Sequence, residues 1–513
     1  MTKRNRKSAF AALLAIVMAF TCITFSAQML AAEAEHAAAE AYELDVPQGY
    51  NANDYAKLRA FLEQEDENGI KNGQKISGNY DPNDISTWDM GIYGESYSSS
   101  MWKPVDGELR LYDLSLWLYD DDWNRITLHG ELDFADCTEL VTVWGSENGF
   151  TAADFSGCSS LEFVYLEKCA LSSLNLCGCP RVMSLDCSDN NLTELRFFES
   201  EADVSAVALE FLDCSGNSIP SLPLSAFPQL HSLYCSYNPL GELDLSGNPL
   251  LFNLSCAGCE LSELNIEHLL LDGLNCSNNS LSELVFHPEA NPYEMNISYN
   301  RIAELELPEN IENLYTLFAE HNQLTSLDLS GASTLYELNL IGNPLTLLLL
   351  DTPSIPIKRL EAASITEGLE PAGSVSLAWF SYERYDEEEG YHYWIDVHTA
   401  TAQDEFVYGF QGWRDTDGNA IYGFTDIYLD DHSLPDVLIA MFRGRLPGDV
   451  NFDGEVNMID ATLTLRYVLG DAGWSELNPQ AADMNGDHTT DMRDALLILR
   501  VALSQNGGQT PLE

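Results

Sequence analysis

Two segments near the C-terminus carry acidic and amide side chains at a regular spacing. The first runs from Asp449 to Asp460 and the second from Asp483 to Asp494, and equivalent residues are 34 positions apart. In both segments side-chain oxygens occupy positions 1, 3, 5, 9 and 12, while position 7 offers its backbone carbonyl. A hard cation such as Ca²⁺ needs six to eight oxygen ligands, which a tight loop with alternating ligands supplies. The spacing therefore predicts two calcium sites.

The predicted metal ligands share this alternating register. They are Asp449, Asn451, Asp453, Glu455, Asn457 and Asp460 for the first ion, and Asp483, Asn485, Asp487, Thr489, Asp491 and Asp494 for the second. The pattern is that of an EF-hand-type loop with Asp instead of Glu at position 12. In the second loop, position 6 is His488 instead of Gly and position 8 is Thr490 instead of an aliphatic residue. We therefore expect the second loop to bind calcium less tightly.

Each predicted loop runs into an apolar segment with helical spacing, residues 461–469 and residues 495–503. A duplicated calcium loop and helix with Asp at position 12 resembles the type I dockerin, and the resemblance covers residues 446–505. It implies a small α-helical module that folds on calcium and binds a cohesin module of a scaffoldin in the cellulosomes of anaerobic bacteria. Metal binding would then contribute free energy of folding directly.

The resemblance also implies where the cohesin partner binds. In the family, recognition residues lie at loop positions 10 and 11 and on the helix at positions 17 and 18. The matching residues here are Met458, Ile459, Leu465, Arg466, Met492, Arg493, Leu499 and Arg500. The two leucines fit packing inside the module equally well, and both interpretations stay open. The pairs at positions 10 and 11 differ from the small hydroxyl pairs of some dockerins, so the choice of cohesin also stays open.

The middle of the chain repeats one short pattern. The segments 185–195, 233–243 and 274–284 each match L-x-L-x-x-[N/C]-x-L or its cysteine-bearing form, with an Asn six positions into the unit. Equivalent Asn or Cys markers lie at 148, 169, 190, 217, 238, 259, 279, 300, 322 and 343, at spacings of 20–22 residues except for one of 27. The pattern resembles the leucine-rich repeat, which implies a solenoid of short parallel strands with return arms. We expect the marker side chains to hydrogen-bond backbone groups between successive turns.

The cysteines follow the repeat register. Five of them, Cys187, Cys214, Cys235, Cys256 and Cys276, occupy the second apolar position of consecutive repeats. This register favours buried free thiols packed as small hydrophobic side chains. Neighbouring rungs lie about 5 Å apart, which disulfide geometry permits, so bonded pairs remain the alternative.

The residues between the two apolar strand positions should face the concave side of the solenoid. This row holds aromatic and acidic residues in its N-terminal half and amides in its C-terminal half. We single out Trp144, Tyr165 and Tyr234 as candidate partner-binding residues. Exposed aromatic side chains on such a face indicate a surface for a protein or a glycan. Ordinary stacking between neighbouring strands is an equally good interpretation.

From the array and its flanks we expect an α/β-type solenoid, followed by a small β module and a small α-helical calcium-binding dockerin. The helical spacing of residues 53–63 lies in a predicted N-terminal cap, and residues 374–442 alternate like strands. The expected parts are a signal peptide (1–34), the cap (35–110), the solenoid (111–352), a β module or spacer (353–443), the dockerin (446–505) and a tail (506–513).

The charge of the chain excludes several classes of partner. With 24 Lys and Arg against 81 Asp and Glu, the net charge is −57, which disfavours binding to nucleic acid or to anionic lipid. The basic residues Lys3 to Lys7 precede an apolar run to Phe25, which predicts a secretory signal peptide, with an N-terminal anchor as the alternative. We expect a secreted, extracellular protein, associated with a cellulosome or the cell surface, with no membrane span in its mature form.

Three functions follow from this organisation. The first is a non-catalytic binding subunit that a scaffoldin carries and whose repeat surface binds a protein or plant cell-wall ligand. The second is a polysaccharide hydrolase, since dockerins commonly accompany such enzymes, although no HExxH or GxSxG motif is present. The third is a surface adhesin. The sequence favours the first of these.

Overall fold

The computed structural model describes most of the chain between residues 46 and 505. The described ranges are 46–88, 101–119, 124–198, 207–352, 355, 358–364, 373–385, 392–404, 410–417, 419–422, 426–429, 434, 436–442, 448–451, 455–469, 482–484 and 489–505. The predicted signal peptide and tail lie outside these ranges. Two compact units divide at Tyr112, and each is considered by itself.

The first unit contains the predicted helix. Helix α2 (Ala52–Leu62) begins at the N-cap Asn51, whose Oδ1 accepts from the backbone N–H groups of Asn53 and Asp54. The apolar face of this helix, formed by Tyr55, Leu58 and Leu62, is buried, and the helix confirms the helical spacing expected for residues 53–63. The other elements of this unit are α3 (Asn72–Ile76), the 3₁₀ turn η1 (Ile85–Thr87), β1 (Trp102–Val105) and β2 (Glu108–Leu111).

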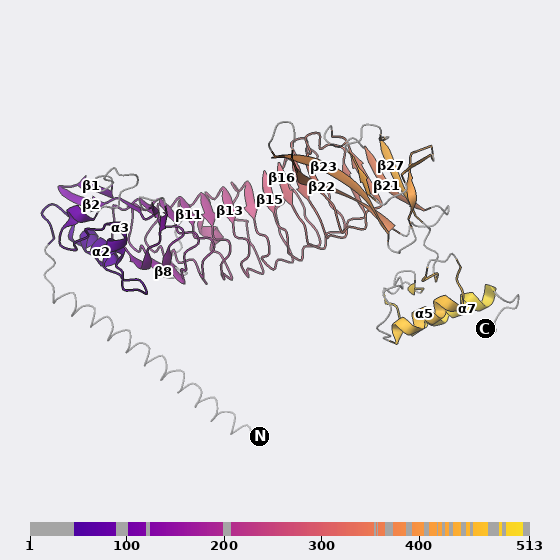
Figure 1. The fold of residues 1–513 in the computed structure, drawn as a ribbon, viewed down its shortest axis with the longest axis horizontal. Coiled ribbons are helices and arrows are strands. Elements are labelled where there is room, and N and C mark those ends of the chain that lie inside the picture. Colours follow the sequence, from indigo (N-terminus) through magenta and orange to yellow (C-terminus); the bar gives the residue numbers. More distant parts are fainter. Residues whose placement is uncertain are drawn as a thin grey trace, which may run out of the picture. The chain divides into compact units, whose positions relative to one another are not determined.

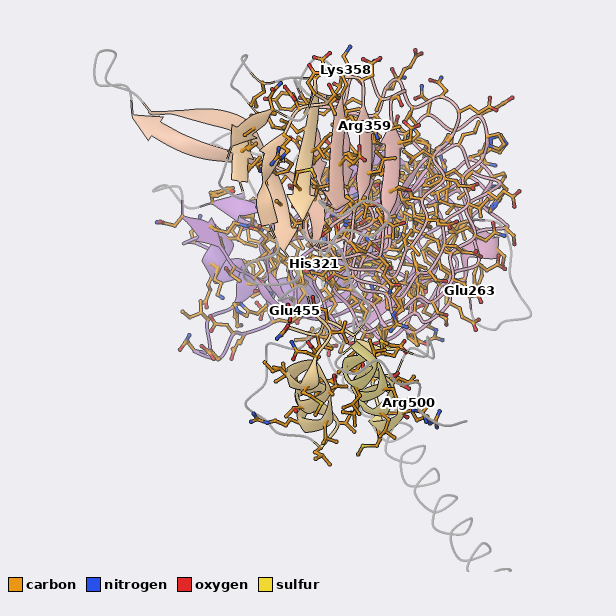
Figure 2. All side chains as sticks on the ribbon, turned by 90° about the vertical axis from the view of Figure 1, so that its right-hand side faces the viewer. Glu263, His321, Lys358, Arg359, Glu455 and Arg500 are labelled. Atoms are coloured by element: carbon orange, nitrogen blue, oxygen red, sulfur yellow. The ribbon has the colours of Figure 1, made fainter. Side chains whose placement is uncertain are left out.

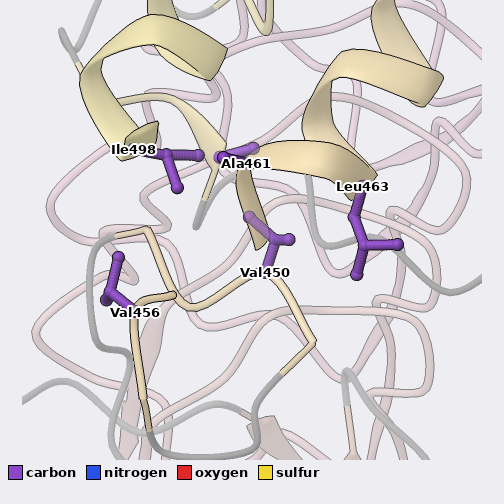
Figure 3. Packing of buried hydrophobic residues seen from close by; sticks show 6 residues of the cluster. Val450, Val456, Ala461, Leu463 and Ile498 are labelled. Carbon is purple, nitrogen blue, oxygen red and sulfur yellow. The ribbon is translucent and has the colours of Figure 1, made fainter. Parts of the chain in front are cut away.

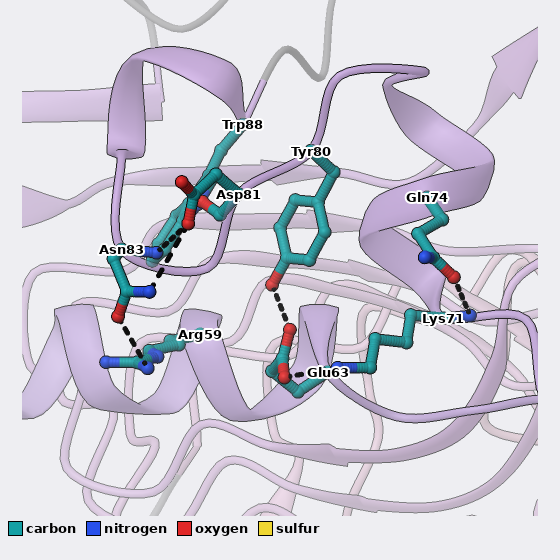
Figure 4. A network of polar contacts seen from close by, with 8 residues as sticks. All are labelled: Arg59, Glu63, Lys71, Gln74, Tyr80, Asp81, Asn83 and Trp88. Atoms are coloured by element: carbon teal, nitrogen blue, oxygen red, sulfur yellow. Dashed lines mark hydrogen bonds and ion pairs between the residues drawn. The ribbon is translucent and has the colours of Figure 1, made fainter.

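Polar contacts join the elements of this unit. The buried Asp54 accepts from Arg110 on β2, with Nε to Oδ2 at 2.7 Å and Nη2 to Oδ1 at 3.2 Å. On the other side of α2, Glu63 accepts from the Lys71 ammonium and from the Tyr80 hydroxyl, both at 2.7 Å (Figure 4). Charge-assisted bonds of this kind fix the helix against the segments that follow it.

The second unit is built on a ladder of short parallel strands (Figure 1). Neighbouring strands pair in register, for example Leu212 opposite Leu185 and Leu233. The rungs are β3 (Asp113–Ser115), β7 (Thr142–Trp144), β9 (Phe163–Tyr165), β11 (Ser184–Asp186), β12 (Phe211–Asp213), β13 (Ser232–Tyr234), β14 (Asn253–Ser255), β15 (Gly273–Asn275), β16 (Glu294–Asn296), β17 (Thr316–Phe318) and β19 (Glu337–Asn339). The central residue of each rung is buried, so the two outer residues form the concave face.

The return arms lie behind this ladder. Near the N-terminal end they include a second parallel sheet of β10 (Ser173–Asn175), β8 (Gly149–Asp154) and β6 (His129–Asp133), and farther along a 3₁₀ turn, η3 (Leu224–Ala226). The stretch from Ile126 to Phe134, which precedes the first Asn marker at 148, supplies β6. The strand of the first repeat is β3, which pairs with β7. The solenoid of short parallel strands is therefore confirmed.

The marker side chains form the expected hydrogen-bond ladder. In the repeat of Asn238, the amide Nδ2 donates to the Cys214 carbonyl at 2.9 Å and to the Cys235 carbonyl at 3.1 Å. Its Oδ1 accepts from the Ile219 N–H at 2.9 Å, and Ile219 belongs to the previous repeat. Where the marker is cysteine, the thiol donates instead, as Cys259 does to the Cys235 carbonyl at 3.2 Å. Each marker thus satisfies buried backbone groups of two successive turns.

The cysteines are free thiols in the described chain. Ten of the eleven are buried and Cys169 is half-buried. Burial raises the pKa of the Cys276 thiol to about 12 and raises that of Cys256 strongly. The interpretation as small buried hydrophobic residues is therefore supported over bonded pairs.

The strands of the β module continue the main ladder and also a further sheet that begins with β18 and β20 of the last repeats. Strand β22 (Gly373–Tyr385) pairs antiparallel with β19 and with β23 (His392–Asp404), and β23 pairs with β26 (Asp426–Tyr428). The order of strands in this further sheet is β18 (Ser326–Leu329), β20 (Leu347–Leu350), β21 (Arg359–Ser364), β27 (Val437–Phe442), β24 (Phe410–Arg414) and β25 (Ala420–Tyr422). Edge strands expose unpaired backbone groups, so these strands close the C-terminal end of the array.

Candidate functional site

The C-terminal segment contains two helices that follow the two acidic loops. Helix α5 (Met458–Val468) and helix α7 (Met492–Gln505) pack against each other. A small apolar core joins them to the loops (Figure 3). Its buried members are Val450, Val456, Ala461, Leu463, Ala482 and Ile498. The core includes Val450 and Val456 of the first loop and Ala461 directly after it, so the loop is anchored to the helices.

The last residue of each acidic loop makes the same contacts. Asp460 is fully buried, and its Oδ1 accepts from the Val450 N–H at 2.9 Å while its Oδ2 accepts from the Asn457 N–H at 2.8 Å. In the second copy, Asp494 is also fully buried and accepts from the N–H groups of Met484 and Asp491, both at 2.9 Å. The sequence duplication is therefore a structural duplication.

The first loop holds two buried carboxylates. Asp449 is only 2% exposed and lies in the same short loop as the buried Asp460. Two buried carboxylates in one loop repel each other, and an all-oxygen donor set of this kind fits Ca²⁺. Asp453, Asn485 and Asp487 lie outside the described residues.

The other described candidate ligands also lie within the two loops. Asn457 caps α5 through its Oδ1, which accepts from the Ile459 N–H at 2.7 Å, and Asp491 does the same for Arg493 at 2.7 Å. Asn451 and Asp483 are half-buried, while Glu455 and Thr489 are exposed. Those two were predicted to act through backbone carbonyls, which their exposed side chains permit.

The concave face of the solenoid carries two separate hollows. The first, here called the aromatic hollow, has a volume of about 270 Å³. It is lined by Trp117, Trp144, Ser146, Glu147, Tyr165, Glu167 and Asp186. The rings of Trp144 and Tyr165 are stacked with centroids 4.2 Å apart. Both interpretations of these residues therefore have support, because the rings stack across strands and Trp144 also remains exposed.

The second hollow, here called the amide hollow, has a volume of about 340 Å³. Its side chains come from five neighbouring rungs, β13 to β17, and are mostly uncharged. The lining residues are Tyr234, Asn253, Leu254, Ser255, Gly273, Leu274, Asn275, Glu294, Met295, Asn296, Thr316 and Phe318. Tyr234 thus lies in a different hollow from Trp144 and Tyr165.

Carboxylates run along the concave face beside the aromatic hollow. Burial raises the pKa of the Asp213 carboxyl, and the charges of Asp186 and Glu167 raise it further, against the hydrogen bonds from Ser215. Behind the hollow, Arg125 donates to the Ser146 carbonyl at 2.6 Å and lies 5.7 Å from the Trp117 ring centroid. The hollow therefore combines aromatic rings with clustered negative charge.

Comparison with known families settles the nature of the C-terminal segment. The sequence model of the dockerin type I domain matches residues 447–501. Residues 447–501 form a type I dockerin domain. Dockerin domains of this type bind calcium and bind cohesin modules, and this one follows a leucine-rich repeat solenoid in the same chain.

Solved structures similar to this chain are leucine-rich repeat proteins. YopM of Yersinia enterocolitica is 26% identical with a TM-score of 0.36, and the match covers 43% of this chain and 47% of YopM. YopM of Yersinia pestis is 23% identical with a TM-score of 0.38, covering 48% and 70% of the two chains. InlJ of Listeria monocytogenes, whose functional domain includes a cysteine ladder, is 17% identical with a TM-score of 0.29, covering 61% and 90%. The chain thus spans under half of the first YopM. No curated protein matches it.

The dockerin helices place most of the predicted cohesin-binding residues at the surface. Met458, Ile459, Leu465, Arg466, Met492, Arg493 and Arg500 are exposed, and Arg500 projects from α7 (Figure 2). Leu499 differs, because it is half-buried and packs against the apolar core of the module. The two leucines therefore differ: Leu499 packs inside the module, whereas Leu465 faces solvent and stays a candidate for cohesin binding.

Sequence reasoning missed several surface residues. Trp117 lines the aromatic hollow, and Gly273 opens the amide hollow, although neither follows the row of residues from which candidates were chosen. On the dockerin, Leu469 and Leu496 are also exposed. The only signal for the amide hollow is a glycine at a strand position where neighbouring repeats carry Asn and Glu. Among the helices of the described ranges, none has the length and apolar character that a bilayer crossing demands.

Proposed function

We propose that this protein is a secreted, non-catalytic binding subunit. Its dockerin attaches it through two calcium ions to a cohesin module of a scaffoldin. Its solenoid presents the concave face to a protein or plant cell-wall ligand, in an extracellular assembly that degrades polysaccharide. The observation that carries the proposal is the duplicated calcium loop and helix at residues 447–501.

The arrangement supports docking in a specific way. Asp460 and Asp494 each join a loop to the start of a helix, so calcium bound in the loop would fix the helix end. Recognition residues at that end, Ile459 and Arg493, would then be held in place at the surface. Removing calcium should loosen the first loop, because its two buried carboxylates, Asp449 and Asp460, then lack the ion that offsets their repulsion.

A panel of cohesin modules tests the proposal. The full chain is mixed with each cohesin in calcium and again in excess chelator, and binding is measured by calorimetry. We expect at least one cohesin to bind in calcium and to lose its affinity in chelator. Binding that ignores the chelator, or no binding to any cohesin by a protein that does take up calcium, would contradict the proposal.

The aromatic hollow supports a second candidate function, polysaccharide hydrolysis. Glycosidases use a pair of carboxylates beside the bound sugar, and Glu147, Glu167 and Asp186 line this hollow together with three aromatic side chains. Release of reducing sugar from cellulose, xylan and pectin is the measurement. Release by the native protein that disappears in Glu167→Gln or Asp186→Asn would replace the non-catalytic proposal with this one.

A further inference from the structure

The amide hollow arises because one repeat lacks a side chain on the concave face. Gly273 pairs with Asn253 on one side and Glu294 on the other, and both of those residues carry side chains. Its backbone is not in the left-handed region, so glycine is not required there by the backbone conformation. A Cβ at this position would lie 2.7 Å from the Asn253 Oδ1, so the Asn253 side chain would have to turn aside to admit it. The missing side chain at residue 273 therefore leaves a gap in the row of side chains on the sheet surface.

The amides that line this hollow present donors to the solvent. The Oδ1 of Asn275 accepts from the Ser277 N–H at 3.2 Å and from its hydroxyl at 2.8 Å, and the Oδ1 of Asn296 accepts from the Ser298 N–H at 3.1 Å. An N–H donor fixes which end of the amide is the oxygen. Both Nδ2 groups are thus turned away from these backbone donors, and each can offer two N–H bonds to a ligand.

Aromatic rings close the two ends of the hollow. Tyr234 lies on β13 and Phe318 on β17, and three rungs separate them. Adjacent strands lie about 4.8 Å apart, so the rungs span roughly 19 Å between the two rings. The distance of about 4.8 Å between neighbouring strands is comparable to the length of one sugar unit in an extended glycan. Consecutive sugars would therefore meet amide donors on consecutive rungs. Aromatic faces also offer flat apolar surfaces to the C–H groups of a sugar ring.

The charges decide between kinds of ligand. Glu294 is the only ionisable carboxylate that lines the amide hollow, and it is exposed at the rim. A basic peptide would find more complementary charge at the aromatic hollow, with its three carboxylates. A polyanionic glycan such as a polyuronate would be repelled by a protein of net charge −57. Uncharged hydroxyl groups, which both donate and accept, match the amides and hydroxyls of the amide hollow.

We propose that the amide hollow binds an extended, uncharged polysaccharide along the solenoid axis. The inference rests on the proposed function and names the ligand class of its concave face. Tyr234 and Phe318 bracket the chain of sugars, and Asn275 and Asn296 hydrogen-bond to its hydroxyl groups. Binding depends little on salt, because no ion pair contributes to it.

The test uses the full-length protein in calcium and soluble polysaccharides. Glucomannan, mixed-linkage β-glucan and arabinoxylan are the neutral probes, and polygalacturonate is the anionic probe. Affinity is measured by calorimetry at low and at high salt. Gly273→Gln places a side chain in the hollow. Gly78→Gln is the control for the same substitution away from the hollow, because its new Cβ has nothing within 4 Å. Circular dichroism and cohesin binding of each variant show that the fold and the dockerin are intact.

We expect at least one neutral polysaccharide to bind with similar affinity at both salt concentrations. Gly273→Gln should weaken this binding at least tenfold, while Gly78→Gln leaves it unchanged and polygalacturonate does not bind. The inference fails if no neutral probe binds, if Gly273→Gln binds as well as the native protein, or if only a Lys- and Arg-rich peptide binds, with steep salt dependence. Each of these results with normal cohesin binding refutes the glycan site alone. Loss of cohesin binding in the native protein refutes the proposed function instead.

Discussion

Substitution of one marker residue, Asn238, measures how much the hydrogen-bond ladder contributes to the stability of the solenoid. Asn238 is 2% exposed and makes three hydrogen bonds to the backbone. In Asn238→Ala, the Ile219 N–H loses the acceptor that Asn238 supplies. The carbonyls of Cys214 and Cys235 each lose one donor but keep another, from Asn217 and from the Cys259 thiol. The three backbone groups are therefore affected unequally.

The expected magnitude follows from this accounting. A buried donor left without an acceptor costs about 1–3 kcal/mol, and each lost bond to a carbonyl that keeps a partner costs about 1 kcal/mol. Asn238→Ala should therefore lower the free energy of unfolding by about 3–5 kcal/mol. Asn238→Cys should cost about 1–3 kcal/mol, because a thiol can still donate to the carbonyls, as at Cys169 and Cys259, and the main loss is the acceptor of the Ile219 N–H. The exposed Asn191→Ala is the control, with a change below about 0.5 kcal/mol.

Urea unfolding followed by far-ultraviolet circular dichroism gives the free energies of unfolding. Repeat arrays can unfold in parts, so hydrogen exchange at the Ile219 amide provides a local measurement beside the global one. That amide should exchange faster in Asn238→Ala than in Asn191→Ala. A cost below about 1 kcal/mol for Asn238→Ala, or equal costs for Ala and Cys, would refute the reasoning.

Three further predictions concern titration and metal binding. Because the pKa of Asp213 is raised in the folded state, the folded protein binds this proton more tightly, so stability falls as pH rises from the ordinary Asp value to the raised one. Asp213→Asn keeps the acceptor for the Ser215 N–H. The variant should therefore have a higher Tm than the native protein at neutral pH, but not below about pH 3.9. A variant whose Tm equals that of the native protein at both pH values would contradict this. A bulky thiol reagent should label at most Cys169 among the described cysteines of the native protein and all of them after unfolding; rapid labelling of Cys276, whose pKa burial raises to about 12, would contradict the buried arrangement. Calorimetric calcium titration should resolve two sites of unequal affinity, and His488→Gly should strengthen the weaker one; an unchanged titration would show that position 6 is not the cause.

The repeat architecture could be predicted from the sequence because its determinants are local and periodic. A buried aliphatic residue in the centre of each rung, most often leucine, and an Asn or Cys marker a fixed distance later set strand, turn and register together, as Leu233 and Asn238 do. The dockerin was predictable for the same reason, since each ligand set lies within one short loop. Both patterns specify contacts between residues that are close in sequence or one repeat apart.

Other features depend on contacts that no local pattern specifies. The alternation of residues 374–442 predicted strands, but not that β22 would pair with β19 and β21 with β20. The aromatic hollow joins Trp117 to Trp144 and Tyr165, and Trp117 lies between elements where no repeat register assigns it a face. Burial of Leu499 but not Leu465 depends on how α5 and α7 pack, although the two positions are equivalent in sequence. In each case the partner in space decides the outcome.

The central claim is that calcium-bound dockerin helices attach this protein to a cohesin through their exposed residues. The most direct test measures cohesin affinity in calcium for the native chain, for Ile459→Asp and for Leu503→Asp. Each variant replaces an apolar side chain that is 55% exposed with a charged one, but Leu503 is not among the predicted recognition residues. Because α7 carries the equivalent position, Arg493→Asp is added to Ile459→Asp in a double variant. We predict that the double variant loses at least tenfold in affinity, about 1.4 kcal/mol, while Leu503→Asp binds like the native chain. Native affinity in the double variant, or equal loss in Leu503→Asp, would contradict the claim.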